Sequence, residues 1–152
     1  MDAVKRRKMV LPSTNRQIDI QQAKVLIIED KLDTLAIMQR LLMFSGFNPK
    51  HCFYKSLSYG VIQFAEYTQI DLILLDLFFS SQANSGYEVL AQIRKHPSIS
   101  YTRTIAITGH VDQMQQTRAA GFDGFIAKPL QLDSFPGQIR RILNGEPVWE
   151  NR

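Results

Sequence analysis

From Ala23 onward, short apolar runs alternate with longer segments in which apolar residues recur at helical spacing. This alternation is typical of strand–helix units that build a parallel sheet. Five strands are predicted over 24–29, 47–53, 71–76, 103–108 and 124–126. The helices predicted after them span 31–45, 56–67, 86–95, 111–120 and 134–144. We therefore expect one open, three-layer α/β/α sandwich with right-handed crossovers.

Two of the predicted strands are apolar without interruption. Val25 to Ile28 and Leu72 to Leu75 have the composition of strands that helices cover on both faces, so we expect them at the centre of the sheet. The last helix is the least regular of the five, because Pro136 and Gly137 lie near its start. We expect it to begin late or with an irregular first turn.

The composition is that of a single globular domain. The chain has 152 residues, of which 45% are hydrophobic, and this suffices for one continuous core. No apolar run approaches the roughly 18 to 20 residues that cross a bilayer. Cys52 is the only cysteine, so an internal disulfide is excluded, and the histidines lack the spacing of metal ligands. We expect a protein of the reducing cytoplasm.

The net charge of +4 is concentrated near the start of the chain. We expect a basic, flexible leader over 1–22, a folded domain over 23–145 and a short tail over 146–152. Short charged termini are usually solvated. No nucleic-acid-reading motif follows the domain, so nucleic acid is not an expected partner.

Polar residues follow every central strand. Glu29 and Asp30 end the first strand, Asp76 the third and Thr108 the fourth, and Lys128 comes just after the fifth. Each residue alone has a structural explanation, such as a helix cap or a common loop pair. Ligands of open α/β sheets bind at the carboxyl ends of the strands, so the coincidence of all five predicts a site there.

The residue types at this edge suit phosphoryl transfer. Three neighbouring carboxylates repel one another unless a cation joins them, and Mg²⁺ prefers such oxygen ligands. Asp76 would then be the nucleophile, while Lys128 and Thr108 would contact the transferring group. The sequence has no glycine-rich phosphate loop and no separate general base, so an activated phosphoryl donor is required.

Four segments carry a resemblance to a known family. They are Lys-Val-Leu-Ile-Ile-Glu-Asp (24–30), Leu-Ile-Leu-Leu-Asp (72–76), Ile-Ala-Ile-Thr-Gly (105–109) and Gly-Phe-Asp-Gly-Phe-Ile-Ala-Lys-Pro (121–129). With these segments, the chain from Lys24 to Leu143 resembles a receiver domain of the two-component response regulators, of the stand-alone type. The resemblance implies a flavodoxin-like fold whose five strands have the order 2-1-3-4-5.

The resemblance also implies roles for the residues at the site. Asp76 is the implied phospho-acceptor, and Glu29 and Asp30 are the implied acidic pair. The implied Mg²⁺ site consists of Glu29, Asp30, Asp76 and the backbone carbonyl of Phe78, and Asp30 would ligate the metal directly.

On the phosphoryl side, the resemblance implies that Thr108 and Lys128 contact the phosphoryl oxygens. Phe125 falls at the family's aromatic switch position, although core packing is an alternative explanation for an aromatic residue there. We expect phosphorylation to draw Thr108 inward and to let the Phe125 ring exchange an exposed rotamer for a buried one.

The loop after Asp76 departs from the family pattern. It reads Leu-Phe-Phe-Ser-Ser-Gln-Ala-Asn-Ser-Gly over 77–86, about two residues longer than usual and without the usual Met-Pro and Asp-Gly. The family pattern therefore does not predict three properties of this chain: the geometry of this loop, the lifetime of the phosphoryl group and the way partners dock. Gly109 keeps the position after Thr108 small, so we expect open access to the acceptor.

The resulting functional prediction is a phosphorylation-controlled signalling switch without substrate turnover. Its phosphoryl donor would be a sensor histidine kinase or a phosphotransfer protein. Its output would be the binding of a downstream protein, or homodimerisation, through the face formed by 111–120, 124–126 and 134–144. One alternative is an interaction module that works without phosphorylation. Another is an aspartyl-phosphate phosphatase, which Phe78 disfavours because it occupies the place of the second acid.

Overall fold

The computed structural model describes residues 17–56, 60–79 and 85–150. Its strands are β1 (Val25–Ile28), β2 (Cys52–Lys55), β3 (Leu72–Asp76), β4 (Arg103–Thr108), β5 (Gly124–Ala127) and β6 (Val148–Glu150). Its helices are α2 (Leu32–Ser45), α3 (Val61–Thr68), α4 (Gly86–Lys95), α5 (Met114–Ala120) and α6 (Phe135–Leu143), with short 3-10 helices η2 (Pro49–His51) and η3 (Val111–Gln113). The basic run at 5–8 and loop positions 80–84 lie outside the described residues.

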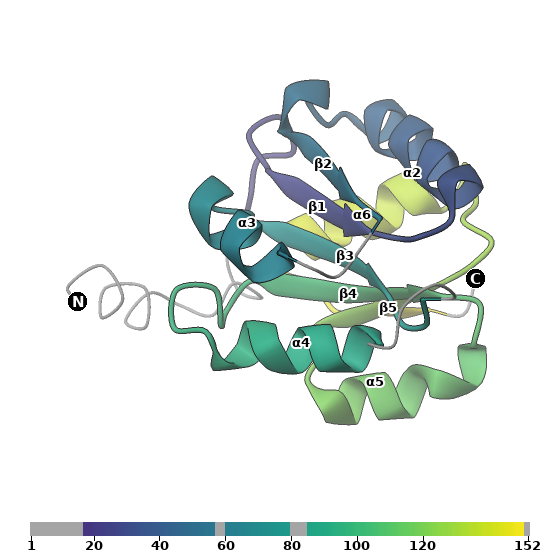
Figure 1. Cartoon of the computed structure of the whole chain (residues 1–152). Coiled ribbons are helices and arrows are strands. Elements are labelled where there is room, and N and C mark those ends of the chain that lie inside the picture. Colours follow the sequence, from purple (N-terminus) through teal and green to yellow (C-terminus); the bar gives the residue numbers. More distant parts are fainter. Residues whose placement is uncertain (1–16, 57–59, 80–84, 151–152) are drawn as a thin grey trace.

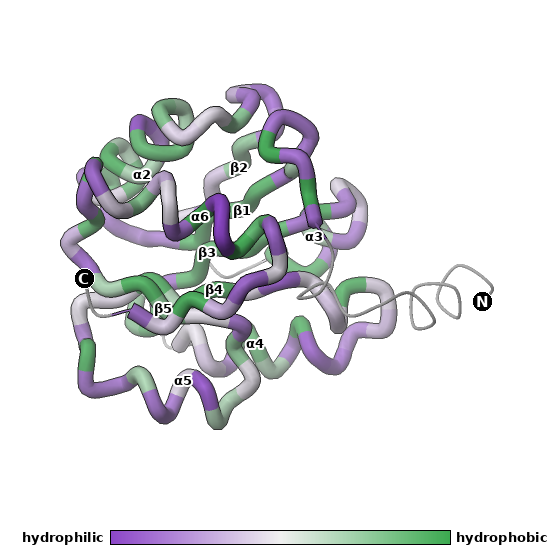
Figure 2. The backbone as a smooth tube through the Cα atoms, turned by 180° about the vertical axis from the view of Figure 1, so that it is seen from behind, coloured by the Kyte–Doolittle hydropathy of each residue, from purple (hydrophilic) through white to green (hydrophobic). Residues whose placement is uncertain are grey.

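All the paired strands are parallel and form one sheet in the order β2-β1-β3-β4-β5-β6. Helices α2 and α6 cover one face, and α3, α4 and α5 cover the other, which gives the expected three layers (Figure 1). Each face has its own hydrophobic core. In Figure 2 the hydrophobic colour gathers along the strands, whereas the helices alternate between the two colours.

The predicted centre of the sheet is confirmed. Every residue of β1 and of β3 is buried, and β1 pairs with β2 on one side and β3 on the other. Strand β3 lies between β1 and β4. Asp76, the last residue of β3, therefore lies at the carboxyl end of an inner strand. Within the described residues, no helix combines the length and apolar character that a membrane crossing requires.

Several predicted boundaries were wrong. The second strand begins at Cys52, because the Asn48 side chain accepts a hydrogen bond from the Lys50 N–H (3.0 Å) and starts a 3-10 turn at Pro49. Helix α3 begins at Val61 instead of 56.

Helix α6 does not begin late. It starts at Phe135, with Pro136 in the first turn and Gly137 inside the helix. Proline is tolerated in a first turn because its missing N–H would have had no partner within the helix.

The expected five-stranded sheet has a sixth strand. β6 pairs with the outer edge of β5 and lies within the segment expected as a tail. A strand of three residues is too short to show an alternating pattern of its own, so the sequence gives no periodic signal for it.

Residues 17–22, which fall in the expected leader, also contact the domain. The Ile18 N–H donates a hydrogen bond to the Leu143 carbonyl oxygen (2.8 Å). The side chains of Ile18 and Ile20 pack against the core between the sheet and helices α2 and α6. Two isoleucines are enough for this docking, although they are too few to form a periodic pattern.

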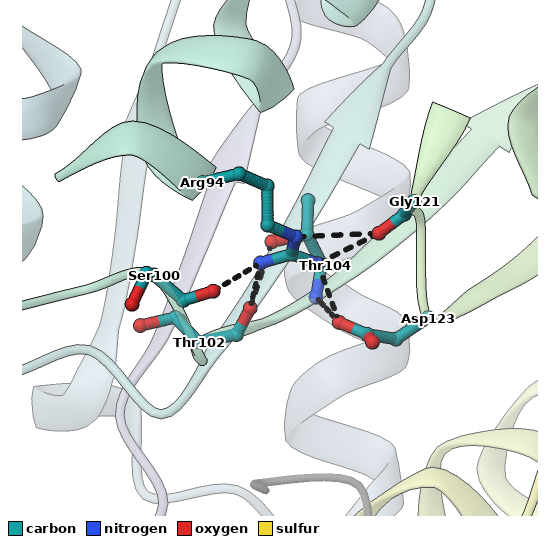
Figure 3. A network of polar contacts seen from close by, with 6 residues as sticks. All are labelled: Arg94, Ser100, Thr102, Thr104, Gly121 and Asp123. Atoms are coloured by element: carbon teal, nitrogen blue, oxygen red, sulfur yellow. Dashed lines mark hydrogen bonds and ion pairs between the residues drawn. The ribbon is translucent and has the colours of Figure 1, made fainter. Parts of the chain in front are cut away.

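Arg94 joins three elements at the amino end of β4 (Figure 3). Its guanidinium forms an ion pair with Asp123 (2.8 Å), whose carboxylate also accepts a hydrogen bond from the Thr104 N–H (2.8 Å). The same guanidinium donates to the carbonyl oxygens of Ser100, Thr102 and Gly121. Arg94 thereby ties α4 to the start of β4 and to the turn before β5.

We expect Arg94→Ala to lower the free energy of unfolding by about 2 kcal/mol, because it leaves several part-buried acceptors without their donor. The neighbouring variant Lys95→Ala removes an exposed cation from the same helix and should change this free energy by less than about 0.5 kcal/mol. Urea denaturation of both variants provides the measurement. Equal effects of the two would contradict the role given to Arg94.

Candidate functional site

The parallel strands bring the predicted site residues to one edge of the sheet. Glu29 follows β1, Asp76 ends β3, Thr108 ends β4 and Lys128 follows β5. Their convergence follows from the register, in which Asp76 pairs with Ile107 and Thr108 pairs with Ala127.

The three acidic residues form a cluster. Carboxylate oxygens of Glu29, Asp30 and Asp76 all lie within 4.8 Å of one another. Glu29 is fully buried and Asp76 is 5% exposed, while Asp30 is half-buried. Hard oxygen ligands at this spacing fit a divalent cation such as Mg²⁺, which would also relieve the repulsion among them.

Lys128 provides a positive charge to this cluster. Its ammonium group forms an ion pair with Glu29 Oε2 and lies 3.6 Å from Asp76 Oδ1. The other oxygen of Glu29 accepts a hydrogen bond from the Lys31 N–H (3.1 Å). Both oxygens of Glu29 therefore already have protein partners.

The Asp76 carboxyl is hard to ionise in this environment. Its pKa is raised to about 6, chiefly by burial and also by the neighbouring Glu29 charge, although Lys128 and the backbone N–H groups of Phe78 and Leu77 act to lower it. Burial outweighs the stabilising contacts, because a charge in a poorly solvated position loses its hydration.

Thr108 is fixed by the backbone around it. Its hydroxyl oxygen accepts a hydrogen bond from the His110 N–H (3.1 Å), and its carbonyl oxygen accepts one from the Lys128 N–H (2.9 Å). The second bond links the end of β4 to the residue after β5. Gly109 is exposed, and a side chain there would meet no atom within 4 Å, which agrees with the expected open access.

Gly86 is a residue of the site that sequence reasoning missed. A Cβ at this position would lie 2.2 Å from the backbone oxygen of Asp76 and 2.9 Å from the Cα of Leu77. The Gly86 N–H also donates a hydrogen bond to the Leu77 carbonyl oxygen (2.7 Å). A glycine at the first position of a predicted helix, where its helix propensity is poor, was the signal that could have identified it.

An aromatic cluster beside the acceptor was also missed. The Phe78 ring, which is 42% exposed, packs edge to face against His110 (4.7 Å between ring centroids) and against Tyr87 (6.4 Å). This cluster joins the loop after β3 to the loop after β4. Only the spatial proximity of Phe78 and His110 reveals it, because they lie far apart in the sequence.

Comparison with protein families identifies this arrangement. The family model of the response regulator receiver domain matches residues 25–140. The chain belongs to this family. Receiver domains are the signalling switches of two-component systems, and they bind Mg²⁺ in an acidic site such as the one formed here by Glu29, Asp30 and Asp76.

Two curated relatives of this receiver domain are longer proteins. A probable cyclic di-GMP phosphodiesterase of Vibrio cholerae is 26% identical over 132 residues, which are 84% of this chain and 28% of that protein. The cell cycle transcriptional regulator CtrA of Caulobacter vibrioides is 27% identical over 120 residues, which are 79% of this chain and 50% of that protein. The chain thus spans half or less of the length of these relatives.

Solved structures support the receiver fold. The chemotaxis protein CheY4 of Vibrio cholerae matches with a TM-score of 0.68 and 19% identity, over 79% of this chain and 98% of that one. The receiver domain of sensor histidine kinase PA1611 from Pseudomonas aeruginosa matches with a TM-score of 0.67 and 21% identity, over 80% of this chain and 97% of that one. That structure is described with a magnesium ion in its active site cleft.

The expected exposed rotamer of Phe125 was wrong. In this receiver domain the Phe125 ring is fully buried in the core beneath α3, α4 and α5. Trp149 of β6 pairs beside Phe125 and packs against the same core. The additional strand contributes to this burial, because it covers the outer edge of β5.

The raised pKa of Asp76 makes a prediction about stability and pH. The folded-state pKa of about 6 exceeds the ordinary value of 3.8, so folding takes up a proton between these two values and stability falls as pH rises through them. With EDTA present, Asp76→Asn should therefore raise the free energy of unfolding at neutral pH by roughly 1 to 3 kcal/mol. This gain should disappear below the ordinary pKa. Urea denaturation across this pH range provides the measurement.

The exposed residue Asp112 provides the matched control. Asp112→Asn removes a carboxylate from η3, and we expect almost no change in stability at any of these pH values. A gain for Asp76→Asn that persisted unchanged in acid would show that ionisation of Asp76 is not its cause.

Proposed function

We propose that this receiver domain is a phosphorylation-controlled switch that accepts a phosphoryl group on Asp76 from a phosphohistidine. The donor would be a sensor histidine kinase or a phosphotransfer protein. The observation that carries the proposal is the position of Asp76, which ends the central strand β3 within one cluster with Glu29, Asp30 and Lys128. Family membership supports the same chemistry.

In the proposed step, a carboxylate oxygen of Asp76 forms a bond to phosphorus while the bond between phosphorus and the donor's imidazole nitrogen breaks. The departing nitrogen keeps the electron pair of that bond. Lys128 would exchange part of its contact with Glu29 for the phosphoryl oxygens, and the Thr108 hydroxyl would donate to one of them. The open space at Gly109 leaves room for the donor's ring.

Asp30, Asp76 and the backbone carbonyl of Phe78 are the groups that would hold Mg²⁺. Bound there, the cation would neutralise charge on the phosphoryl oxygens. Glu29 is assigned the role of supporting acid, because both of its oxygens already accept hydrogen bonds from Lys31 and Lys128.

The proposed output is the binding of a downstream protein, or homodimerisation, through the face formed by α5, β5 and α6. Thr108 ends β4 and Phe125 lies on the neighbouring strand β5, so a movement of Thr108 toward a phosphoryl group would change the packing beside Phe125. Because Phe125 is already buried, we propose that it repacks within the core and shifts β6.

Phosphorylation at a single residue is the first test. Incubation with acetyl phosphate and Mg²⁺, followed by borohydride trapping and mass spectrometry, should locate one modification at Asp76. Asp76→Asn should abolish it, whereas Asp112→Asn, which removes an exposed acid after β4, should leave it unchanged. Undiminished labelling of Asp76→Asn would sink the assignment.

The metal ligands can be tested separately. Mg²⁺ that binds only the folded chain should raise its melting temperature. We expect Asp30→Ala to reduce this rise more than Glu29→Ala does, because the Glu29 oxygens already have protein partners. Differential scanning fluorimetry over a Mg²⁺ titration provides the measurement. A larger loss in Glu29→Ala would reverse the assigned roles.

A further inference from the structure

Strand β6 fills a slot on the outer edge of the sheet. It pairs in parallel with β5, with Gly124 opposite Val148, Phe125 opposite Trp149 and Ile126 opposite Glu150. Without it, β5 would present a row of unpaired backbone groups, to which another extended segment could add.

Side chains hold β6 from both faces of the sheet. On one face, the guanidinium of Arg118 on α5 stacks over the Trp149 ring, 4.4 Å from its centroid. On the other face, Arg141 of α6 forms an ion pair with Glu150 through both nitrogens (2.7 and 2.8 Å), and Gln138 donates to the same carboxylate (3.0 Å). An aromatic residue and the acid that follows it thus each have a side-chain partner on a flanking helix.

The backbone of β5 is also shaped for a close neighbour. A Cβ on Gly124 would lie 2.8 Å from the Val148 carbonyl oxygen, so a side chain there would push the neighbouring strand away. Val148 itself is fully buried and packs into the core beneath α2 and α6. The slot thus has a binding place for an apolar residue, an aromatic residue and an acid in succession.

The resident strand is short, and the turn before it is exposed. β6 has only three residues, and both Trp149 and Glu150 are half-exposed. The turn that leads into it, from Asn144 to Pro147, is largely exposed and contains Gly145 at a positive φ of 84°. Short segments joined through exposed turns are among the parts of a fold that open locally at a low cost in free energy.

We propose that the slot between α5 and α6 is a docking site for an extended segment of a partner protein, in which an apolar, an aromatic and an acidic residue follow one another. The segment adds to β5 as a parallel strand, and β6 is the built-in competitor that it displaces. The two arginines that flank the slot, Arg118 and Arg141, favour an acidic partner. This inference rests on the output face of the proposed function, but its test uses no phosphoryl donor, so its failure would leave the role of Asp76 untouched.

The chain's single tryptophan reports directly on this exchange. The probe is a synthetic peptide that copies residues 146–152 with Trp149→Phe, so that only the protein fluoresces. As the peptide enters the slot, Trp149 emission should move to longer wavelength and acrylamide quenching should increase. Displacing β6 from half of the molecules of the unaltered chain should need roughly millimolar peptide. The reason is that the short turn before β6 gives this strand an effective concentration of that order at its own slot.

A variant whose own β6 binds the slot less tightly should be displaced at a lower peptide concentration. Glu150→Ala in the chain removes the ion pair with Arg141, and we expect half-displacement at a peptide concentration lower by a factor of roughly three. Asp133→Ala, which removes an exposed acid before α6, is the matched control and should not change it. A second peptide that also carries Glu150→Lys should compete poorly, because Arg141 would repel it.

Three results would overturn the proposal. The first is unchanged Trp149 emission in both the unaltered chain and Glu150→Ala at several millimolar peptide. The second is equal competition by the Glu150→Lys peptide, which would mean that the slot does not read the acid. The third is dimerisation of Glu150→Ala without peptide, measured by analytical ultracentrifugation, which would make a second copy of this chain the occupant.

Discussion

The gathering of three carboxylates at one edge of an apolar sheet is the constraint on which the site depends. Parallel strands deliver Glu29, Asp30 and Asp76 to the same place, and burial leaves little water to separate their charges. Lys128 reaches this cluster from the loop after β5 and contacts two of the acids. The segment after β5 thus contributes to the charge balance at the end of the central strand β3, so a shift of this segment would change the charge next to Asp76.

The sequence predicted the features that depend on strongly patterned segments. The apolar runs of β1 and β3 placed the centre of the sheet, and the end of each central strand then placed the acids, Thr108 and Lys128. These predictions succeeded because a parallel sheet fixes where strand ends meet, whatever the details of the helices. The boundaries of the elements were less certain, since a single residue such as Asn48 can begin a turn in place of the start of a strand.

The features that the sequence did not predict depend on contacts between distant residues. Strand β6 is three residues long and exists because β5 offers an edge and Arg118 and Arg141 offer partners. Phe125 is buried in the core beneath α3, α4 and α5, against which Trp149 of this strand also packs. Gly86 stands at the start of a predicted helix, and only the structure shows that its missing side chain makes room for the backbone of Asp76.

The contact between Gly86 and the acceptor strand has a consequence for how this receiver could vary. The Gly86 N–H donates a hydrogen bond to the Leu77 carbonyl oxygen, and this bond holds the two ends of the loop after β3 together. When the ends of a loop are held together, additional residues raise the entropic cost of closing it only slowly. This cost is about 0.6 kcal/mol for each doubling of the loop length. The sequence between Leu77 and Gly86 can therefore lengthen or diversify while the backbone of Asp76 stays in place.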